Sequence, residues 1–438
     1  MRVAVATLGC KVNQYDSASI EARLRSEGCT IVPFETGADV YVVNTCTVTD
    51  RADTESRQIA RRARRLNRAA RVIMTGCFAQ TNPRAAAIAE VDYVVGLNRL
   101  SELVQAVRGQ LDAASDRIRV DDLRTARQVK TLGADSFTGQ TRAFLKIQEG
   151  CDLFCSFCIV PFARGRSRSV PPRHALDNLW LLAERGFREV VLTGVHLGGY
   201  GADLEPAVDL CALLEMIAER PPVPRVRLSS IDPPEVTPRL LDVMARSEVL
   251  CPHLHVPLQS GDDAVLGRMR RHYDTHFLRD LGAEIRRTLP AAAFGTDLIA
   301  GFPGESGAQF DATLQLLEEL PLTYFHVFPY SRRSGTTAAK MSGHLPPVDI
   351  KRRAQRLRKL GERKRAEFAA RFVGCELKVL AERETGREDD RLRGYSRNYQ
   401  RIEFPGPPRW VNREVPVRIT AAQGTTLTGQ VVANVFDD

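Results

Sequence analysis

Three cysteines stand close together near the middle of the chain, in the stretch EGCDLFCSFC. Cys151, Cys155 and Cys158, the central triad, form a C-x3-C-x2-C run, and so tight a run favours an iron–sulfur cluster held by thiolates. Zinc is the main alternative, but a structural zinc site has four ligands, and no cysteine or histidine follows Cys158 at the usual spacing. Buried structural cysteines are the remaining interpretation. On a four-iron cluster, three ligands would leave one iron open to another molecule.

Three further cysteines are far apart in the sequence, but each ends an expected strand. The strands VAVATLGC, VYVVNTC and VIMTGC end at Cys10, Cys46 and Cys77, the N-terminal triad. Parallel strands bring their C-terminal ends to one edge of a sheet, so the pattern predicts a second site with three thiolates. The alternative is that these cysteines are small buried hydrophobic residues. The other four cysteines fit no ligand pattern: Cys29, Cys211, Cys251 and Cys375.

The elements that must position both triads follow from hydrophobic periodicity. In residues 1–110, short apolar runs alternate with amphipathic stretches, and helices are expected over 17–27 and 50–66. This alternation predicts a parallel α/β domain. Residues 142–335 contain six strand-like runs with helical patterns between them. They predict a parallel sheet curled into a partial (β/α)6 barrel, with functional residues at the C-terminal ends of its strands.

The rest of the chain divides into a linker, a connector and a small terminal domain. Residues 111–141 are polar and weakly periodic, as expected of a linker or of a few peripheral strands. Residues 336–370 contain a strongly basic helix, which would connect the barrel to the last domain. In residues 371–438, short alternating apolar runs are separated by Gly, Pro and Asn, which predicts a small antiparallel β-barrel.

Composition excludes several classes of protein. The 438 residues are 43% hydrophobic and 26% charged, which is ordinary for a globular chain and unlike a disordered or fibrous one. No apolar run has the length of a signal peptide or a membrane span, so a cytoplasmic protein without membrane contact is expected. Thiols stay reduced in that compartment, which favours ligand roles over disulfides for the ten cysteines. The net charge of +9 favours a polyanionic partner.

Several motifs resemble those of a known enzyme family. The central triad, with Phe157 before its last cysteine, resembles the signature of the radical SAM superfamily, and DLIAGFPGE, LTGVHLGGYG and HVPLQSG resemble strand ends of that superfamily. TLGCKVNQYDS, VVNTCTVTDRAD and MTGCFAQ, in this order, resemble the N-terminal domain of the methylthiotransferases. Residues 371–438 resemble the TRAM domain with which that family ends. The resemblance spans essentially the whole chain.

The resemblance implies two [4Fe-4S] clusters and S-adenosylmethionine as cofactors. The central triad would hold the cluster whose open iron chelates S-adenosylmethionine, and the N-terminal triad would hold a cluster that presents a sulfur atom at its own open iron. No catalytic residue beyond these cluster ligands is expected. The residues expected to bind S-adenosylmethionine are Phe157, Thr193, Gly194, Ser229, Gln259, Gly301 and Pro303.

Two basic regions indicate an RNA partner. The helix expected over 351–371 carries ten basic and two acidic residues, an excess that suits phosphate contacts. The terminal barrel combines basic side chains with the rings of Tyr395 and Tyr399, on which splayed bases could stack. The alternative is that such rings form the barrel core, as expected for Phe404 and Trp410. The basic barrel residues are Lys378, Arg383, Arg391, Arg393, Arg397 and Arg401. The residues selected as RNA contacts are Lys351, Arg352, Arg353, Arg397 and Tyr399.

The resemblance implies insertion of a methylthio group at C2 of a tRNA adenosine beside the anticodon. LGCKVNQYDS most resembles the branch that acts on N6-threonylcarbamoyladenosine, and the alternatives within the family are isopentenyladenosine in tRNA and an aspartate of a ribosomal protein. A second class of hypothesis is a non-enzymatic iron–sulfur protein that binds RNA. A third is radical chemistry that transfers sulfur without methylation. The expected partners are the tRNA anticodon loop, a reductant protein and a sulfur donor.

Overall fold

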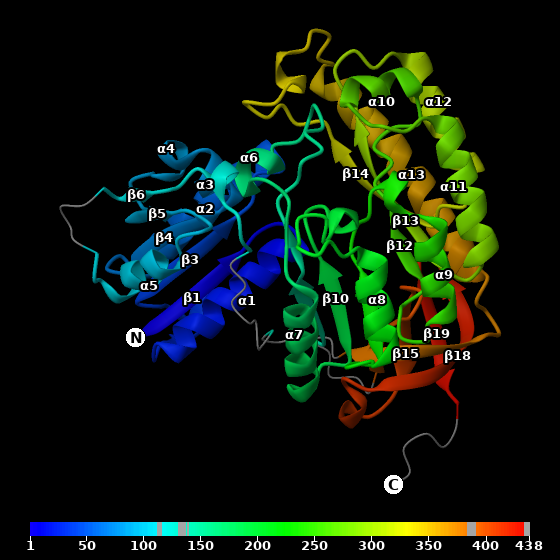
Figure 1. Cartoon of the computed structure of the whole chain (residues 1–438), viewed down its shortest axis with the longest axis horizontal. Helices are drawn as coiled ribbons and strands as arrows, with labels where there is room; N and C mark the ends of the chain where they lie inside the picture. Colours follow the sequence, from blue (N-terminus) through cyan, green and yellow to red (C-terminus); the bar gives the residue numbers. More distant parts are fainter. Residues whose placement is uncertain (112–115, 130–136, 138–139, 383–390, 433–438) are drawn as a thin grey trace.

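The structure is a computed structural model that describes residues 1–111, 116–129, 137, 140–382 and 391–432. Figure 1 shows an N-terminal α/β domain beside a central domain of strands and helices, with a small barrel below the central domain. Some residues of the expected linker and tail lie outside the described part of the chain: 112–115, 130–136, 138–139, Arg383 and 433–438.

The N-terminal domain is built on a six-stranded sheet, in which every neighbouring pair is parallel and the order is β2-β1-β3-β4-β5-β6. Strand β3 is buried along its whole length, as expected of a parallel strand covered on both faces. Its strands are β1 Arg2–Thr7, β2 Thr30–Ile31, β3 Val40–Thr45, β4 Arg71–Gly76, β5 Tyr93–Val95 and β6 Ile118–Arg119. Its helices are α1 Lys11–Ser26, α2 Asp50–Leu66, α3 Cys77–Thr81, α4 Pro83–Ala86 and α5 Leu100–Arg108. Strand β6 comes from the expected linker and adds an edge to this sheet.

Helix α2 spans the predicted residues, whereas α1 begins at Lys11 and not at residue 17 as expected. The reason is that polar residues occupy the buried face of the first turns of α1. Asn13 is buried and donates hydrogen bonds to the carbonyls of Leu8 and Thr45, at 2.6 and 3.0 Å. A buried asparagine of this kind hides the apolar periodicity from which a helix is predicted.

The central domain contains the six predicted strands in their predicted order. They form two three-stranded parallel sheets, β11-β10-β7 and β12-β13-β14, which isolated bridges from Val226 to Leu250 and from Ser230 to His255 join into one open barrel. The strands are β7 Arg142–Lys146, β10 Glu189–Thr193, β11 Arg225–Leu228, β12 His253–His255, β13 Ala293–Ala300 and β14 Tyr324–Pro329. Outside them lie α7 Pro172–Glu184, α8 Leu210–Glu219, α9 Pro238–Arg246, α10 Asp263–Met269, α11 Thr275–Thr288 and α12 Gly307–Glu319. The partial barrel expected from the sequence is thus confirmed.

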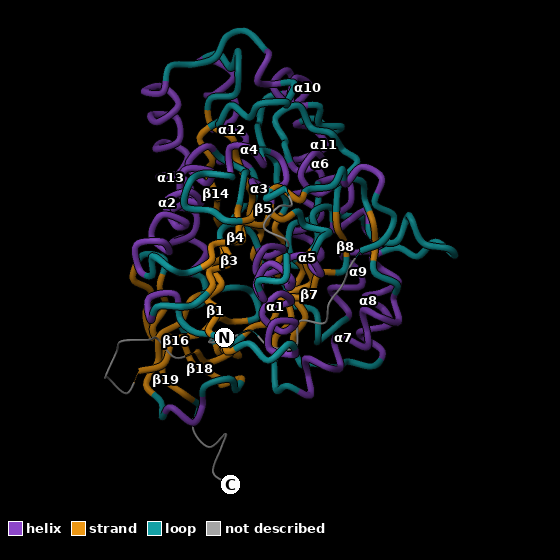
Figure 2. The backbone as a smooth tube through the Cα atoms, turned by 90° about the vertical axis from the view of Figure 1, so that its left-hand side faces the viewer, coloured by secondary structure: helices purple, strands orange, loops and turns teal. Residues whose placement is uncertain are grey.

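The N-terminal domain contacts both edges of this open barrel. Helix α1 lies beside the edge strand β7 (Figure 2). At the other edge, Arg333 follows β14 and makes ion pairs with Asp50 and Asp53, and it donates a 2.7 Å hydrogen bond to Thr47. Because Arg333 is buried, these contacts tie the loop after β3 to the barrel rim.

The last domain is a closed barrel of five strands with order β15-β16-β17-β19-β18. Helix α13, Pro347–Ala370, leads into it, and its strands are β15 Glu376–Glu382, β16 Arg391–Ser396, β17 Arg401–Pro405, β18 Glu414–Gln423 and β19 Thr426–Val431. The expected antiparallel pairing holds for all neighbours except β17 and β19, which are parallel. A closed ring with an odd number of strands cannot alternate direction throughout, so one parallel pair is unavoidable.

A buried charge network joins this small barrel to the base of the central barrel. Glu189 on β10 is fully buried and pairs with Arg225 at 2.8 Å and Arg227 at 2.7 Å. Both guanidiniums also donate to backbone carbonyls at the end of β16 and just after it, at Tyr395 and Arg397. Burial alone would raise the pKa of Glu189, but the two arginines outweigh it and lower that pKa to about 2.

We predict that Glu189→Gln destabilises the protein by about 3–5 kcal/mol, because it leaves two buried guanidiniums without their counter-charge. The measurement is the thermal unfolding temperature of wild type and variant at pH 7. Glu184→Gln, at an exposed position near the end of α7, serves as the matched control and should leave that temperature unchanged.

The pairing of Glu189 with Arg225 and Arg227 also predicts how the stability of the protein depends on pH. The folded-state pKa of Glu189 lies below its ordinary value of 4.5, so its stabilising effect is complete above about pH 4.5 and is lost as the pH falls toward about 2. The difference in stability between wild type and Glu189→Gln should therefore shrink over that range. A difference that stays constant with pH would contradict this account.

Candidate active site

A cavity of about 170 Å³ lies where the N-terminal domain meets the mouth of the open barrel. Its lining comes from the loop after β3, from the central triad and its neighbours, and from the ends of β13 and β14. The lining residues are Val48, Thr49, Phe157, Cys158, Ile159, Val160, Gln259, Asp297, Ile299, Phe328, Pro329, Tyr330 and Ser331. Residues two or three positions after Cys46 thus face the same space as Cys158.

The N-terminal triad comes together at the C-terminal edge of the first sheet, as predicted. Cys10 precedes α1, Cys46 follows β3 and Cys77 is the first residue of α3. The thiols of Cys46 and Cys77 each interact electrostatically with that of Cys10. Gly9, with a φ of +98°, lets the chain pass Cys46 closely, because an added Cβ would lie 2.8 Å from the Cys46 Sγ.

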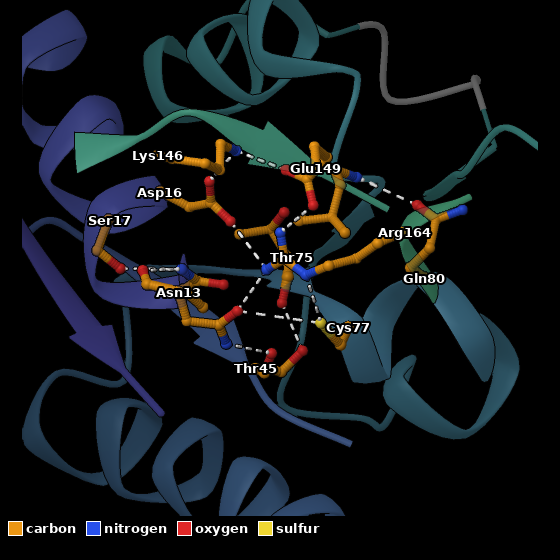
Figure 3. Close-up of polar contacts among 12 residues, drawn as sticks. Asn13, Asp16, Ser17, Thr45, Thr75, Cys77, Gln80, Lys146, Glu149 and Arg164 are labelled. Carbon is orange, nitrogen blue, oxygen red and sulfur yellow. Dashed lines mark hydrogen bonds and ion pairs between the residues drawn. The ribbon is translucent and has the colours of Figure 1, made fainter. Parts of the chain in front are cut away.

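A single buried arginine of the central domain supports this triad. Arg164 ends the short helix α6, Val160–Arg164, and its Nε donates to the Sγ of Cys77 at 3.3 Å (Figure 3). Its other nitrogens bind Asn13 at 2.5 Å, Asp16 at 2.9 Å and Glu149 at 2.7 Å. Burial raises the pKa of the Cys77 thiol to about 12, and the charge of Arg164 opposes that shift.

Lys146 completes the charge balance around Arg164. Its Nζ donates to Asp16 and to Glu149, at 2.6 Å in each case, so two cations and two carboxylates alternate in a closed square (Figure 3). Burial would raise the pKa of Glu149, but Arg164 and Lys146 lower it to about 2. The square contains groups of both domains and therefore fixes the N-terminal triad relative to the central barrel.

The central triad lies in the loop between the short strand β8, Gln148–Glu149, and α6. Burial raises the pKa of Cys151 and of Cys158 to about 12. Arg271 donates to the Sγ of Cys155 at 3.1 Å and pairs with Asp232. Phe154, between the first two cysteines, has a φ of +46°, in the left-handed region that is uncommon for residues other than glycine.

The thiols of neither triad lie as close together as the ligands of a single zinc ion would. In a tetrahedral zinc site with Zn–S bonds of about 2.3 Å, the sulfurs lie about 3.8 Å apart. Within the described residues, His255, Asp297 and His326 are the one set of three candidate ligands whose atoms all lie within 4.8 Å of one another. Neither thiol triad is that compact, and all six cysteines are free thiols.

The residues selected for S-adenosylmethionine binding gather at the C-terminal end of the barrel. Thr193 ends β10 and Gly194 follows it, Ser229 follows β11, and Gly301 and Pro303 follow β13. The hydroxyl of Ser229 is buried and has no hydrogen-bond partner among the described residues, which suits a polar ligand atom. Two further selected residues line the cavity: Phe157 and Gln259.

Gln259 adopts a backbone conformation that is rare for its residue type. Its φ is +67°, and it forms an isolated bridge with Leu298 beside the cavity. Non-glycine residues are held in this region when surrounding contacts fix them, and such residues concentrate at ligand sites. Its position supports the selection made from the sequence, while its contact with a cofactor stays a prediction.

Below the cavity, a chain of hydrogen bonds runs through three neighbouring strands. His326 Nδ1 and His255 Nε2 both contact Asp297 Oδ1, at 3.2 and 2.8 Å. Tyr324 places its hydroxyl 3.0 Å from His255 Nδ1 and 2.8 Å from His253 Nε2. Its ring occupies the space above Gly295, where an added Cβ would lie 1.9 Å from the ring. Burial lowers the pKa of both His253 and His255, so these buried imidazoles are neutral.

Comparison with known proteins agrees with this arrangement. Family profiles match in order along the chain: uncharacterized protein family UPF0004 over residues 2–96, the radical SAM superfamily over 145–317 and the TRAM domain over 370–432. A threonylcarbamoyladenosine tRNA methylthiotransferase of Bacillus subtilis is 38% identical, covering 100% of this chain and 97% of that protein. A tRNA-2-methylthio-N(6)-dimethylallyladenosine synthase of Moorella thermoacetica is 33% identical, covering 98% of each chain.

The chain belongs to the radical SAM methylthiotransferases. Membership implies S-adenosylmethionine and a [4Fe-4S] cluster, for which the central triad provides three thiolates. Among solved structures, the radical S-adenosylmethionine methyltransferase TsrM from Kitasatospora setae has a TM-score of 0.58. It is 18% identical and covers 77% of this chain and 76% of its own, so it shares the fold of this methylthiotransferase and nothing more.

The basic residues selected as RNA contacts do not all face solvent in the methylthiotransferase. Lys351 and Arg352 are exposed on α13. Arg353 is buried and pairs with Glu305, so its selection was wrong: the guanidinium points into the fold. Arg397 is half-buried and held by Glu414 at 2.7 Å, and Tyr399 packs against His253 beneath the central barrel. Both residues belong to the junction between the two barrels and not to an outer RNA surface, which corrects the expectation for them.

Two functional residues were not selected from the sequence. Arg164 and Arg271 contact cysteines of different triads, yet each stands in a run of basic residues that resembles an ordinary charged surface. The one feature of the sequence that could have indicated Arg164 is its place shortly after Cys158, in the segment VPFARGRSR. No described helix is both long and apolar enough to span a lipid bilayer.

We predict that Arg164→Met lowers stability by about 3–5 kcal/mol, because Glu149 and Asp16 lose a buried counter-charge. Because Arg164 contacts Cys77, the substitution should also lower the iron content of the anaerobically reconstituted protein by about four per chain, the iron of the second cluster that the resemblance implies. Thermal unfolding and iron analysis measure the two effects. Arg166→Met, two residues further on and largely exposed, is the control and should change neither. Full iron content in a destabilised Arg164→Met protein would show that Arg164 serves the fold alone.

Proposed function

We propose that this methylthiotransferase inserts a methylthio group at C2 of N6-threonylcarbamoyladenosine next to the tRNA anticodon. The single observation that carries the proposal is the cavity shared by the two domains, which reaches Cys158 on one side and the loop after Cys46 on the other. A reaction that breaks a C–H bond and delivers sulfur to the same carbon needs both functions beside one substrate. An RNA-binding protein with structural clusters has no need of such a cavity.

The comparisons support this choice of substrate. Proteins named as threonylcarbamoyladenosine tRNA methylthiotransferases are 38% and 39% identical to this chain, from Bacillus subtilis and Aquifex aeolicus. Those named as dimethylallyladenosine synthases, from Moorella thermoacetica and Methylobacillus flagellatus, are 33% and 34% identical. The difference between these sequence identities is small. The residues that line the cavity are therefore a better guide to the substrate than the identities are.

Two cofactor sites follow from the proposal. The central triad would hold the [4Fe-4S] cluster with which S-adenosylmethionine yields a deoxyadenosyl radical, and the N-terminal triad would hold a second cluster that carries the sulfur. The chain itself contributes the enclosure. Phe157, Ile299 and Phe328 line the cavity with apolar groups, which would reduce the access of water to a reactive intermediate. Arg164 and Arg271 offset negative charge beside the two triads.

Contacts to tRNA would come from exposed basic residues near the cavity rim and on the outer surface. Lys351 and Arg352, near the start of α13, are exposed and follow directly after the connector from the rim. Their role is electrostatic, since cations that neutralise phosphates bind RNA without reading its sequence. A reductant protein and a sulfur donor complete the expected partners, and such a reaction on tRNA takes place in the cytoplasm.

The dimethylallyl group is the second candidate substituent, and the apolar wall is the observation that favours it. Phe157, Ile299 and Phe328 would contact such a group well. The polar side chain of Asp297 in the lining favours the threonylcarbamoyl group, because an apolar substituent would cover this carboxylate without offering it a further hydrogen bond.

We predict that a variant with alanine at Cys10, Cys46 and Cys77 still cleaves S-adenosylmethionine under reducing conditions but produces no methylthiolated nucleoside. The reason is that the central triad is intact while the sulfur-carrying site is lost. Liquid chromatography with mass spectrometry measures both products, using tRNA that carries N6-threonylcarbamoyladenosine as substrate. The reciprocal variant, with alanine at the central triad, should lose both activities.

Nucleoside analysis of tRNA from cells that lack the protein tests the substrate. The expected result is loss of 2-methylthio-N6-threonylcarbamoyladenosine alone, with the 2-methylthio form of isopentenyladenosine unchanged. Loss of the isopentenyl form instead would assign the enzyme to the other branch, and loss of neither would overturn the proposal.

A further inference from the structure

Two histidines and one aspartate meet on three neighbouring strands of the central barrel, β12, β13 and β14 (Figure 1). Asp297 on β13 is paired in register with His326 on β14, so their side chains stand on the same face of the sheet. On the other side of β13, His255 of β12 is paired with Gly295, two residues before Asp297. Because residues two apart share a face of a strand, the register gathers three donor groups, the His255–Asp297–His326 cluster.

The donor atoms of this cluster have the spacing of ligands around one metal ion. Nε2 of His255 and Nδ1 of His326 lie 2.8 and 3.2 Å from Oδ1 of Asp297, and all three atoms lie within 4.8 Å of one another. Neighbouring ligands of an octahedral ion with bonds of about 2.1 Å lie about 3.0 Å apart, and opposite ligands about 4.2 Å. Hydrogen bonds have similar lengths, so charge must decide between a metal ion and a purely hydrogen-bonded cluster.

The carboxylate of Asp297 has no basic side chain beside it, although only 23% of its side chain is exposed. Within the described part of the chain, its ion-pair contacts are both with imidazoles, which carry a charge only when protonated. The buried carboxylates of Glu189 and Glu305, in the same barrel, each pair with arginine instead. A sheltered carboxylate without a cation is unfavourable, and a divalent metal ion would supply the missing counter-charge.

Tyr324 fixes the orientation of one of the two imidazoles. Its hydroxyl lies 3.0 Å from Nδ1 of His255, whereas the other ring nitrogen, Nε2, faces Asp297. The tyrosine ring reaches this position across Gly295, because an added Cβ at that residue would lie 1.9 Å from the ring. Metal-binding histidines are usually oriented in this way, by a polar partner on the nitrogen that does not bind the metal.

The cluster also borders the active-site cavity. Asp297 is one of the residues that line the cavity, and 58% of the His326 side chain is exposed. Three protein ligands leave a metal ion with at least one open coordination position. An ion at this place could therefore bind water or a ligand in the cavity, as ions in catalytic sites do and ions in structural sites do not.

We propose that His255, Asp297 and His326 bind one divalent transition-metal ion, such as Zn²⁺, beside the active-site cavity. Two imidazoles and one carboxylate are a donor set that suits zinc and its neighbours in the first transition row. The set contains no thiolate, so the site is separate from both cysteine triads. The open position of the ion would take an oxygen atom, such as that of a carboxylate or a hydroxyl group. The metal site goes beyond the proposed function and does not depend on it, since an ion can bind here whichever nucleoside the enzyme modifies.

Titration of the anaerobically reconstituted holoprotein with Zn²⁺ tests this site. Isothermal titration calorimetry measures affinity and stoichiometry, and X-ray absorption at the zinc edge identifies the bound atoms without interference from the cluster iron. We expect one ion per chain, with nitrogen and oxygen ligands at about 2.0–2.2 Å and no sulfur. Zinc–sulfur distances of about 2.3 Å would place the ion at cysteines and overturn the proposal, as would the absence of binding.

Matched variants test the ligands one by one. Asp297→Asn and His326→Ala should each weaken zinc binding by at least about 10- to 100-fold, which is the usual cost of losing even an outer partner of a metal ligand. Tyr324→Phe, which removes such an outer partner, should lose about 10- to 100-fold. His276→Ala is the control: it removes a histidine that also pairs with an aspartate, Asp280, but both are highly exposed on α11, so zinc affinity should not change.

Thermal unfolding and iron content show whether each variant is folded and carries its clusters. His326→Ala is the most informative variant, because its side chain is largely exposed and its loss should not disturb the fold. If this variant is folded and loaded but binds zinc with wild-type affinity, His326 is not a ligand and the proposal fails. That failure would leave the proposed function intact, whereas failure of the nucleoside analysis would leave the metal site intact.

Discussion

The arrangement of this methylthiotransferase depends on one buried guanidinium. Arg164 belongs to the loop of the central triad, but its hydrogen bonds reach a cysteine, an asparagine and an aspartate of the N-terminal domain. In a region of low dielectric constant, an arginine with several charged acceptors is held much more firmly than a surface ion pair. The relative position of the two triads therefore follows from the requirement that this charge stay balanced, with Lys146, Asp16 and Glu149 completing the balance.

The open barrel places a second constraint on how the N-terminal and central domains pack together. Six strands do not close a barrel, and the exposed edges of β7 and β14 would otherwise be left to solvent or to another chain. The N-terminal domain contacts both edges, through α1 and through the loop that Arg333 holds. Closure of the barrel and formation of the cavity are thus one event, because the loop that contacts Arg333 also supplies Val48 and Thr49 to the cavity.

Much of this could be predicted from the sequence, since strand order and thiol convergence are local consequences of parallel α/β topology. The strands before Cys46 and Cys77 are continuous apolar runs, and such runs are read reliably. A count of basic residues along α13 does not show which of them face the protein interior. Leu357, Leu360 and Phe368 are buried at helical spacing, and Arg353 lies on the same buried face. Arg164 could not have been assigned, because its partners come from segments brought together only by the tertiary fold.

The origin of Arg164 in the chain has a consequence for how the protein matures. The three cysteines of the N-terminal triad leave the ribosome well before residue 164 is synthesised, so the nascent N-terminal domain has its thiols but not the cation that faces Cys77. In that state Asp16 also lacks both of its basic partners, Lys146 and Arg164. The surroundings of Cys77 are therefore complete only after the central domain has been synthesised and has folded against the first.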